Sequence, residues 1–385
     1  MPALDARRLL AELAQTRAPL DEARTLPASA YRSPELFALE MRELFAKMWL
    51  CVGREEQVEA PRAFITHALG PEDRERALIV RDDAGTLRAF YNVCRHRAAR
   101  LIDAPRGSLR AINCPYHKWS YGLDGRLRHA PRTDASFDCA AHSLIEMPLA
   151  VFEGHIYVNL DAHAPPREQA HADLPSAASH RLGELRVARR HDYTVAANWK
   201  VVIENYGECY HCAVIHPQLH RLSDFQGGAF VEGACFNGGP MRLREGVQTL
   251  SMSGASPLGP IPGLAEADRD QVHYNHVYPN FTLALHPDYV LTHTVWPLSP
   301  EQTRVHCEWL VWPAALEGEA PADLSDILEF WDRTNRQDWD MCARVQQGLR
   351  SAGYRRGPYT AMERCIHAFD RWYVEAIGPA LEALR

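Results

Sequence analysis

Apolar and polar residues alternate differently in three stretches of the chain. In residues 1–44 the apolar positions recur at helical spacing, which predicts two helices. One runs from about Ala3 to Gln15, and the other begins after Ser33-Pro34, where Ser33 suits the N-cap and Pro34 the first helical position. From about Met48 to Leu160, short β-branched runs separated by turns with Asp and Gly predict a small all-β region.

Strands and helices mix in the remainder, after a linker rich in Ala, His and Pro at residues 161–175. Residues 226–270 are rich in Gly, Pro and Ser and are expected to form loops over a pocket. Helices are predicted at Trp199–Ile215, at about Ser325–Leu349 and at about Thr360–Leu384. The fold class is therefore α+β.

Length and composition narrow the functional classes. A chain of 385 residues is long enough for two domains, and a net charge of −7 without a basic cluster argues against nucleic-acid binding. No apolar run reaches the length of a membrane span, and the N-terminus lacks the apolar core of a secretory signal. The ten cysteines lack the spacing of a disulfide framework, so we expect reduced thiols and a cytoplasmic location.

The β region contains the pattern C-x-H followed by C-x2-H, formed by Cys94, His96, Cys114 and His117. Two thiolates and two imidazoles can bind zinc, or they can hold a [2Fe–2S] cluster with both histidines on one iron. Zinc fingers usually pair two cysteines in one short arm and two histidines in the other. Here each arm carries one of each, which favours the Rieske type of iron–sulfur cluster over zinc.

A second candidate metal site lies in the predicted helix after Trp199. Glu208 and His211 are three residues apart and would share a helix face, while His216 lies at the helix end. Two imidazoles and one carboxylate suit Fe(II) with open positions for O2, although zinc hydrolases use similar sets. The candidate carboxylates on the late helix are Asp332, Asp338 and Asp340.

The two cluster loops closely resemble those of Rieske non-haem iron oxygenases, in the segments 92–97 (NVCRHR) and 114–121 (CPYHKWSY). The usual glycines of the family are replaced by Ala98 and Lys118, and neither change affects a cluster ligand. The resemblance covers most of the chain. It implies a terminal oxygenase (alpha) subunit with a Rieske β-domain at 45–163, inserted near the N-terminus of a helix-grip catalytic domain at 1–44 and 164–385.

The resemblance also implies a role for each site residue. Cys94, His96, Cys114 and His117 would hold the [2Fe–2S] cluster, while His211, His216 and Asp338 would hold a mononuclear Fe(II), with Asp340 as the second choice for the carboxylate. Glu208 would bridge His117 of one subunit to His211 of its neighbour in a homotrimer and carry electrons between them. The thiols of Cys209 and Cys212, a C-x2-C motif, are expected to pack beside the iron rather than to react.

The implied activity uses O2 as co-substrate. Electrons would come from NAD(P)H through a flavin-containing or iron–sulfur reductase, or through a ferredoxin. Segments 198–206 and 346–359 look like those of glycine betaine, choline and carnitine oxygenases, which implies oxidative N-demethylation or C–N cleavage of a quaternary ammonium compound. An aromatic cage would hold such a cation. The candidate cage residues are Tyr206, Tyr210, Tyr278, Phe281 and Trp296.

Two other functions stay open at this point. The first is mono- or dioxygenation of an aromatic or alicyclic acid in an apolar pocket with an Arg or His for the carboxylate. The histidines at 273, 276, 286 and 293 lie in the segment expected to line the pocket, but the sequence assigns none of them a role. The second is a protein without enzymatic activity, either a Rieske electron carrier or a binding module held together by zinc.

Overall fold

The computed structural model describes residues 5–134, 136–318 and 321–385, so Ala3 and Leu4 of the first predicted helix lie outside the described residues. The chain divides into two compact units, Met1–Phe45 with Glu168–Arg385 and Ala46–Arg167. The second unit is inserted into the first, as the predicted α+β architecture requires. We propose that these units are the two expected domains, whose predicted boundaries at residues 44/45 and 163/164 lie close to this division.

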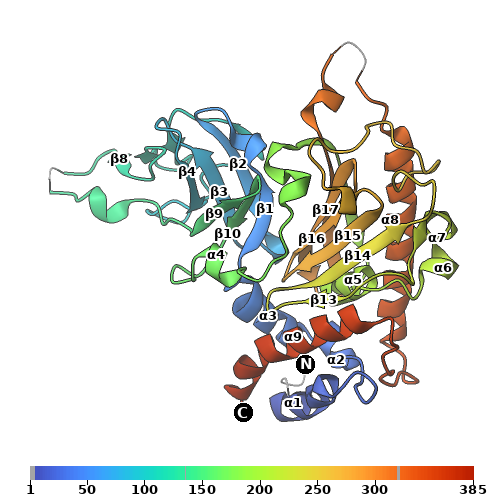
Figure 1. Cartoon of the computed structure of the whole chain (residues 1–385). Helices are drawn as coiled ribbons and strands as arrows, with labels where there is room; N and C mark the ends of the chain where they lie inside the picture. Colours follow the sequence, from blue (N-terminus) through green and yellow to red (C-terminus); the bar gives the residue numbers. More distant parts are fainter. Residues whose placement is uncertain (1–4, 135, 319–320) are drawn as a thin grey trace. The chain divides into compact units, whose positions relative to one another are not determined.

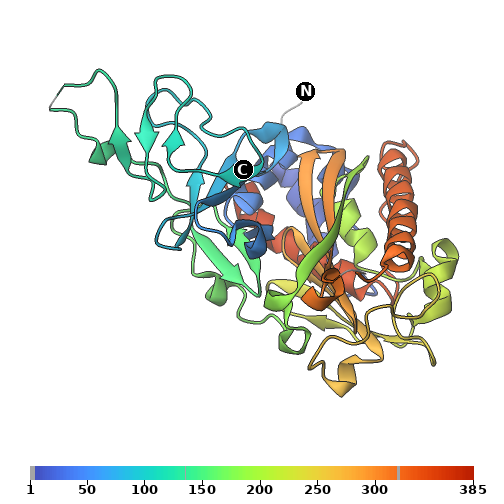
Figure 2. The same cartoon turned by 90° about the horizontal axis from the view of Figure 1, so that it is seen from above.

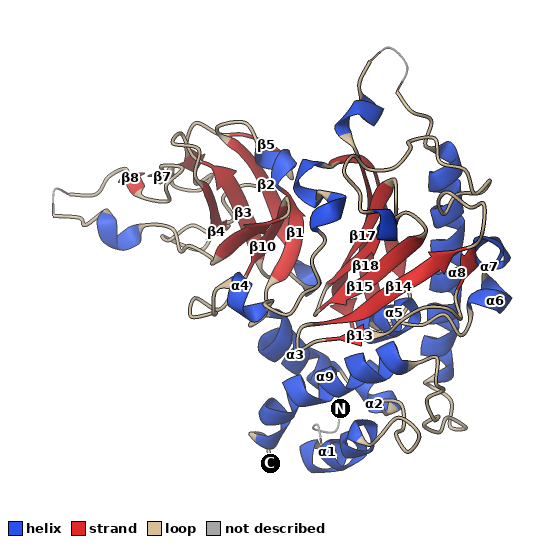
Figure 3. Ribbon diagram, viewed as in Figure 1, coloured by secondary structure: helices blue, strands red, loops and turns tan. Residues whose placement is uncertain are grey.

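The inserted unit contains three antiparallel sheets, whose strand orders are β1-β10-β9, β4-β3-β2-β5 and β6-β7-β8 (Figure 3). Its strands are β1 (Leu50–Arg54), β2 (Ala63–Ala68), β3 (Arg76–Arg81), β4 (Leu87–Tyr91), β5 (Arg106–Ser108), β6 (Ile112–Asn113), β7 (Ser120–Tyr121), β8 (Leu127–His129), β9 (Leu149–Phe152) and β10 (His155–Val158). The buried core of this unit includes Leu78, Phe90 and Ile112, and also Cys94 and Cys114.

The other unit is organised around an eight-stranded antiparallel sheet, with the order β11-β18-β17-β16-β15-β14-β12 and β13 paired to β14. The strands are β11 (Arg186–Val195), β12 (Ser223–Asp224), β13 (Val231–Glu232), β14 (Phe236–Leu243), β15 (Gln271–Val277), β16 (Phe281–Leu285), β17 (Tyr289–Ser299) and β18 (Gln302–Val311). Strands β13 and β14 fall inside the segment 226–270, so the prediction that this segment consists of loops was only partly right.

Helices pack beside this sheet, and both views show the long α8 next to the strands (Figures 1 and 2). The helices are α1 (Ala6–Ala14), α2 (Ala28–Arg32), α3 (Pro34–Glu40), α4 (Arg167–Ala170, at the boundary of the units), α5 (Trp199–Tyr206), α6 (Cys212–Ile215), α7 (Pro217–Leu222), α8 (Ser325–Gly348) and α9 (Arg364–Glu382). Among the described residues, no helix combines the length and apolar composition needed to cross a membrane.

The predicted helix at Trp199–Ile215 is interrupted. Helix α5 ends at Tyr206, and the backbone N–H of Gly207 caps it by donating to carbonyls of the last turn. The Glu208 carboxylate then accepts the backbone N–H groups of Tyr210 and His211, which offers the chain a turn in place of the next helical bonds. The prediction that Glu208 and His211 share one helix face was therefore wrong.

A buried carboxylate, Glu40, joins three segments that are far apart in the sequence. It accepts hydrogen bonds from the Trp199 indole (2.9 Å), the Lys200 ammonium (2.6 Å) and the Tyr373 hydroxyl (2.6 Å). The side chains of Glu40 and Lys200 are almost entirely buried. Because a buried charge is tolerated only when it is paired and hydrogen-bonded, this cluster fixes the end of α3 against α5 and α9.

We expect the substitution Lys200→Met to destabilise the unit by about 3–5 kcal/mol, because it leaves the Glu40 carboxylate buried without its counter-charge. The measurement is the midpoint of urea unfolding followed by circular dichroism. The matched control is Arg42→Met, which removes the cation of an exposed pair with Glu43 and should cost less than about 1 kcal/mol. Equal midpoint shifts in the two variants would contradict this role for the buried pair.

Candidate metal centres

Two loops of the inserted unit have the same backbone form. In each loop the carbonyl of a buried cysteine accepts the N–H of the residue four positions later, from Ala98 to Cys94 (3.1 Å) and from Lys118 to Cys114 (3.2 Å). Ala98 and Lys118 both have positive φ, at 56° and 60°. Glycine adopts this backbone conformation most readily, which accounts for the glycines that the family usually carries at these two positions.

The loops bring the two predicted cluster histidines together and place both predicted cysteines in the buried core of the unit. The ring centroids of His96 and His117 lie 4.6 Å apart, and Cys94 and Cys114 are both buried thiols. The Nδ1 atom of His117 is buried and has no hydrogen-bond partner among the described residues. Burial, together with His96 and Arg97, lowers the pKa of His117, so its ring is neutral at pH 7. Two buried sulfurs and an unsatisfied neutral imidazole fit a cluster held by two cysteines and two histidines.

Tyr121 supports the first of these sulfurs. Its hydroxyl oxygen accepts the N–H of Arg95 (3.1 Å) and lies 3.4 Å from the Sγ of Cys94. Burial raises the pKa of Tyr121, so the hydroxyl keeps its proton and can donate it toward the sulfur. Hydrogen bonds to cluster sulfurs are one of the means by which a protein raises the reduction potential of a cluster. Sequence reasoning did not single out Tyr121.

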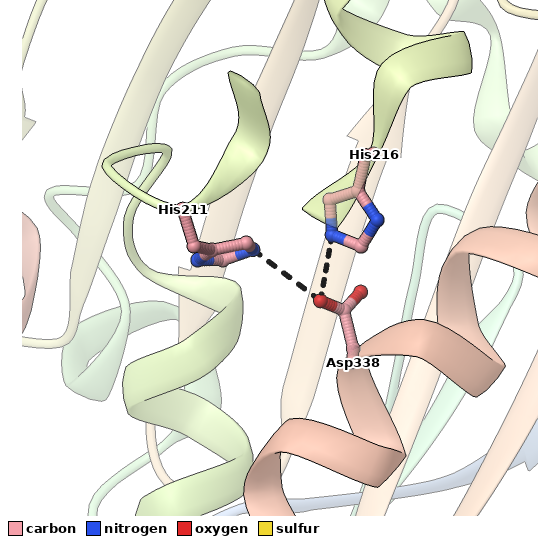
Figure 4. A group of neighbouring side chains, drawn as sticks. All are labelled: His211, His216 and Asp338. Carbon is pink, nitrogen blue, oxygen red and sulfur yellow. Dashed lines mark hydrogen bonds and ion pairs between the residues drawn. The ribbon is translucent and has the colours of Figure 1, made fainter. Parts of the chain in front are cut away.

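The second candidate centre lies in the larger unit. His211 precedes α6, His216 follows α6, and Asp338 extends from α8 toward both rings (Figure 4). The Oδ1 of Asp338 lies 2.8 Å from the Nε2 of His216 and 3.3 Å from the Nε2 of His211. Potential ligand atoms of these three residues all lie within 4.8 Å of one another. Asp340, the second choice for the carboxylate, instead pairs with Arg344 on the exposed face of α8.

The hydrogen bonds around this triad indicate a site for a cation. His216 Nδ1 donates to the Gln337 Oε1 (2.8 Å), which is an acceptor because it also receives the Gln218 amide (2.7 Å). His211 Nδ1 donates to the Glu208 carboxylate. In neutral rings both Nε2 atoms are then acceptors, and they face a carboxylate oxygen that is an acceptor too. Three converging acceptors need a cation between them, which is the donor set of a two-histidine, one-carboxylate metal site.

The same attraction acts on a proton. Although burial alone disfavours a charged ring, hydrogen bonds to Asp338 and Glu208 raise the pKa of His211 to about 10. Burial also disfavours the charged form of Asp338 and would raise its pKa, but the hydrogen bonds from His211 and His216 lower the pKa of this carboxyl. A divalent metal ion and a proton therefore compete for this position.

The turn that holds Glu208 also contains a disulfide. Cys209 and Cys212 are bonded to each other, so the expectation that all the cysteines are reduced was wrong for this pair. The other eight cysteines form no disulfide. The Cα atoms of Cys209 and Cys212 lie 4.9 Å apart, within the range that a disulfide spans.

A cavity of about 530 Å³ opens beside the triad, between the sheet and helices α5, α8 and α9. Of the predicted cage residues only Tyr206 lines it. Tyr210 is exposed, and Tyr278, Phe281 and Trp296 are buried outside the lining. Apart from Tyr206 and the triad histidines His211 and His216, the aromatic and histidine side chains that line the cavity are Phe225, Phe230, Tyr274, His276, His293, Trp331 and Trp339. The alternation of Tyr274 and His276 along β15 is a signal that could have identified two of them.

Two family models match the chain in the order that the folded units suggest. The model described as the Rieske [2Fe-2S] domain matches residues 48–153. The model described as the ring hydroxylating alpha subunit (catalytic domain) matches residues 182–378. The chain belongs to the ring-hydroxylating alpha-subunit family. This alpha subunit is therefore a Rieske-type oxygenase whose cofactors are a [2Fe–2S] cluster and a mononuclear iron, as predicted. The assignment of ligands to each metal stays a prediction.

Named relatives share most of the length of this alpha subunit. The glycine betaine monooxygenase oxygenase subunit of Chromohalobacter salexigens is 32% identical, over 93% of this chain and 87% of that protein. The plant enzyme choline monooxygenase of Amaranthus tricolor is 26% identical, over 94% of this chain and 80% of that protein. The crystal structure of the quaternary ammonium Rieske monooxygenase CntA with L-carnitine is 26% identical, with a TM-score of 0.77, covering 98% of this chain and 99% of that one.

More distant structures share the fold of this alpha subunit. Naphthalene 1,2-dioxygenase from Rhodococcus is 19% identical with a TM-score of 0.75, and covers 97% of both chains. At this identity the likeness concerns the fold alone. The match to the catalytic-domain family over residues 182–378 also excludes the two alternatives without enzymatic activity, because an electron carrier or a zinc module would not contain that domain.

We expect Gln337→Leu to weaken Fe(II) binding by about 10–100-fold, because the His216 ring loses the acceptor that fixes its orientation. Iron retained per chain after dialysis against a chelator is the measurement, and the visible absorption of the cluster should not change. Gln347→Leu, an exposed position on the same helix, is the matched control. Unchanged iron retention in Gln337→Leu would show that this hydrogen bond does not support the metal site.

Proposed function

We propose that this alpha subunit oxidises an N-methyl group of a quaternary ammonium compound and thereby releases the methyl group as formaldehyde. The observation that carries the proposal is a row of aromatic and imidazole rings in the cavity lining beside the triad. The centroid of Tyr206 lies 6.2 Å from that of Tyr274 and 6.1 Å from that of His293, and His293 lies 6.4 Å from Trp339. A quaternary ammonium group has no proton to donate, so aromatic faces are its natural partners.

The names of the relatives support the same substrate class, because they refer to glycine betaine, choline and carnitine. The reaction balances with one O2, two electrons and two protons. One oxygen atom leaves in formaldehyde and the other in water, while the ammonium becomes a protonated tertiary amine. The electrons would come from NAD(P)H through a reductase partner, and we place the protein with that partner in the cytoplasm.

Seven side chains would hold the cofactors. Those of the cluster are Cys94, His96, Cys114 and His117, and those of the iron are His211, His216 and Asp338. When bound, the cluster would supply single electrons and the iron would supply the site for O2. Around them the protein acts through Gln337 and Glu208, which orient the two imidazoles, and through the aromatic rings of the cavity lining, which would contact the substrate.

Glu208 is the residue that we propose to link two subunits of a homotrimer. Its carboxylate contacts the His211 ring and lies in a turn flanked by exposed apolar side chains, since Tyr210 is 58% exposed and Val214 is 82% exposed. Tyr116, next to the cluster residue His117, is also 58% exposed. Exposed aromatic and aliphatic side chains beside both centres suit a contact between copies of the chain. A solved quaternary ammonium Rieske monooxygenase, 25% identical to this chain, has given insights into inter-subunit electron transfer in that protein.

We expect Glu208→Gln to keep both metals but to lower turnover driven by the reductase by about 10–100-fold or more, because the amide still accepts from His211 but carries no charge to pair with a cluster histidine. Turnover driven by hydrogen peroxide, which needs no electron from the cluster, should be retained. Formaldehyde formation is the measurement for both. Full reductase-driven activity in this variant would remove Glu208 from the electron path.

The substrate class is tested by supplying hydrogen peroxide to the iron-loaded protein in the absence of a reductase, with quaternary ammonium compounds and aromatic acids in parallel. We expect demethylated amine and formaldehyde, identified by mass spectrometry, because peroxide provides both oxygen and electrons. A hydroxylated ring in place of these products would make the protein a ring hydroxylase, and the cage formed by Tyr206, Tyr274 and His293 would lose its proposed role.

A further inference from the structure

The charged side chains of the substrate cavity are few and unequally placed. Among the described lining residues, the carboxylates are Glu208 and Asp338, both at the iron triad. Arg364 is the one lysine or arginine in the same lining. Burial lowers the pKa of His276 to about 3 and that of His293 to about 4, so these two rings add no positive charge at pH 7. Arg364 therefore supplies the positive charge of the lining outside the triad.

Arg364 lies where this cavity adjoins a second one. It is the first residue of α9, and together with Phe230 it lines both the substrate cavity and a neighbouring cavity of about 520 Å³. Its guanidinium forms no hydrogen bond or ion pair with any described residue. In the neighbouring cavity the carboxylate of Glu232 is already paired with Arg371 (2.7 Å), so it does not neutralise Arg364. Glu363, the preceding residue, uses its carboxylate to accept the Thr360 N–H.

A second observation indicates a polar ligand near the same helix. His276 is 2% exposed, and its Nδ1 has no partner among the described residues, while its Nε2 is 3.5 Å from the carbonyl of Pro279. Its cross-strand neighbour Asn237 donates to the carbonyl of Cys365 (2.6 Å), which ties these strands to the first turn of α9. Because the Pro279 carbonyl can only accept, Nε2 of the neutral ring carries the proton and Nδ1 is an acceptor, so a ligand group that donates a hydrogen bond would be favoured at Nδ1.

We infer that Arg364 is the residue that recognises a carboxylate on the substrate, so that this oxygenase prefers quaternary ammonium compounds with a carboxylate over amino alcohols. The inference rests on the proposed function. A guanidinium binds a carboxylate through two parallel charge-assisted hydrogen bonds, which a hydroxyl group cannot reproduce. The cationic methyl-bearing end would then face the triad and the π-faces, and the anionic end would face Arg364.

The test compares glycine betaine and carnitine, which carry a carboxylate, with choline, which does not. Binding to the iron-loaded protein is measured by isothermal titration calorimetry, and demethylation is measured with hydrogen peroxide. We expect Arg364→Gln to raise the Kd and KM of the carboxylated compounds by about 10–100-fold, the loss typical of one charge-assisted pair, with kcat nearly unchanged. The Kd of choline should stay within about twofold, and Arg364→Lys should restore part of the loss.

Arg17→Gln is the matched control, because Arg17 lines the neighbouring cavity but not the substrate cavity. Arg17→Gln should leave the Kd and KM of the carboxylated compounds and of choline unchanged. An equal loss for choline and for the carboxylated compounds in Arg364→Gln, or a wild-type preference for choline, would overturn the inference. If the wild type binds the carboxylated compounds through Arg364 but demethylates none, the proposed function fails and the carboxylate site stands. If it binds none of the three, both fail.

Discussion

The arrangement of the catalytic unit depends on the hydrogen bonds and the ion pair that the buried Glu40 carboxylate forms. This carboxylate takes three donors from α5 and α9, and it belongs to a segment that precedes the inserted unit in the chain. With a charge at this position, α3, α5 and α9 have to pack so that the buried carboxylate keeps its three donors. The start of α5 is thereby fixed, and the turn that carries Glu208 and His211 follows the other end of this helix.

The interruption of the helix after Tyr206 places Glu208 and His211 in a turn, where we propose that His211 binds the metal. Glu208 accepts two backbone N–H groups of the turn and also the His211 Nδ1–H, so a single carboxylate shapes the loop and orients the His211 ring. The other ring is oriented by Gln337. Both Nε2 atoms then face Asp338, and the cost of bringing three acceptors together is offset only when a cation or a proton lies between them.

Features that depend on local spacing could be predicted from the sequence, and features that depend on tertiary competition could not. The residues of the C-x-H and C-x2-H loops are a few positions apart, and so are the two histidines beside Glu208. The long helix α8 shows the regular spacing of apolar residues that is typical of a helix. The break at Gly207 could not be predicted, because it depends on the Glu208 carboxylate binding backbone N–H groups that would otherwise continue the helix. Tyr210 was wrongly expected to line the pocket for the same reason, since the break turns it outward.

The described lining of the cavity contains no carboxylate other than Asp338 of the triad and the neighbouring Glu208. A cationic substrate would therefore bind mainly to aromatic and imidazole rings. Histidines 276 and 293 lie too deep to be charged, so they offer π-faces and single polar atoms but no repulsion to an ammonium group. A fully apolar lining would give no orientation, and an acidic lining would compete with Asp338 for the metal. Neutral imidazoles among tyrosine and tryptophan rings avoid both costs. The one guanidinium of the described lining, at the start of α9, can then determine which end of a substrate faces the iron ligands.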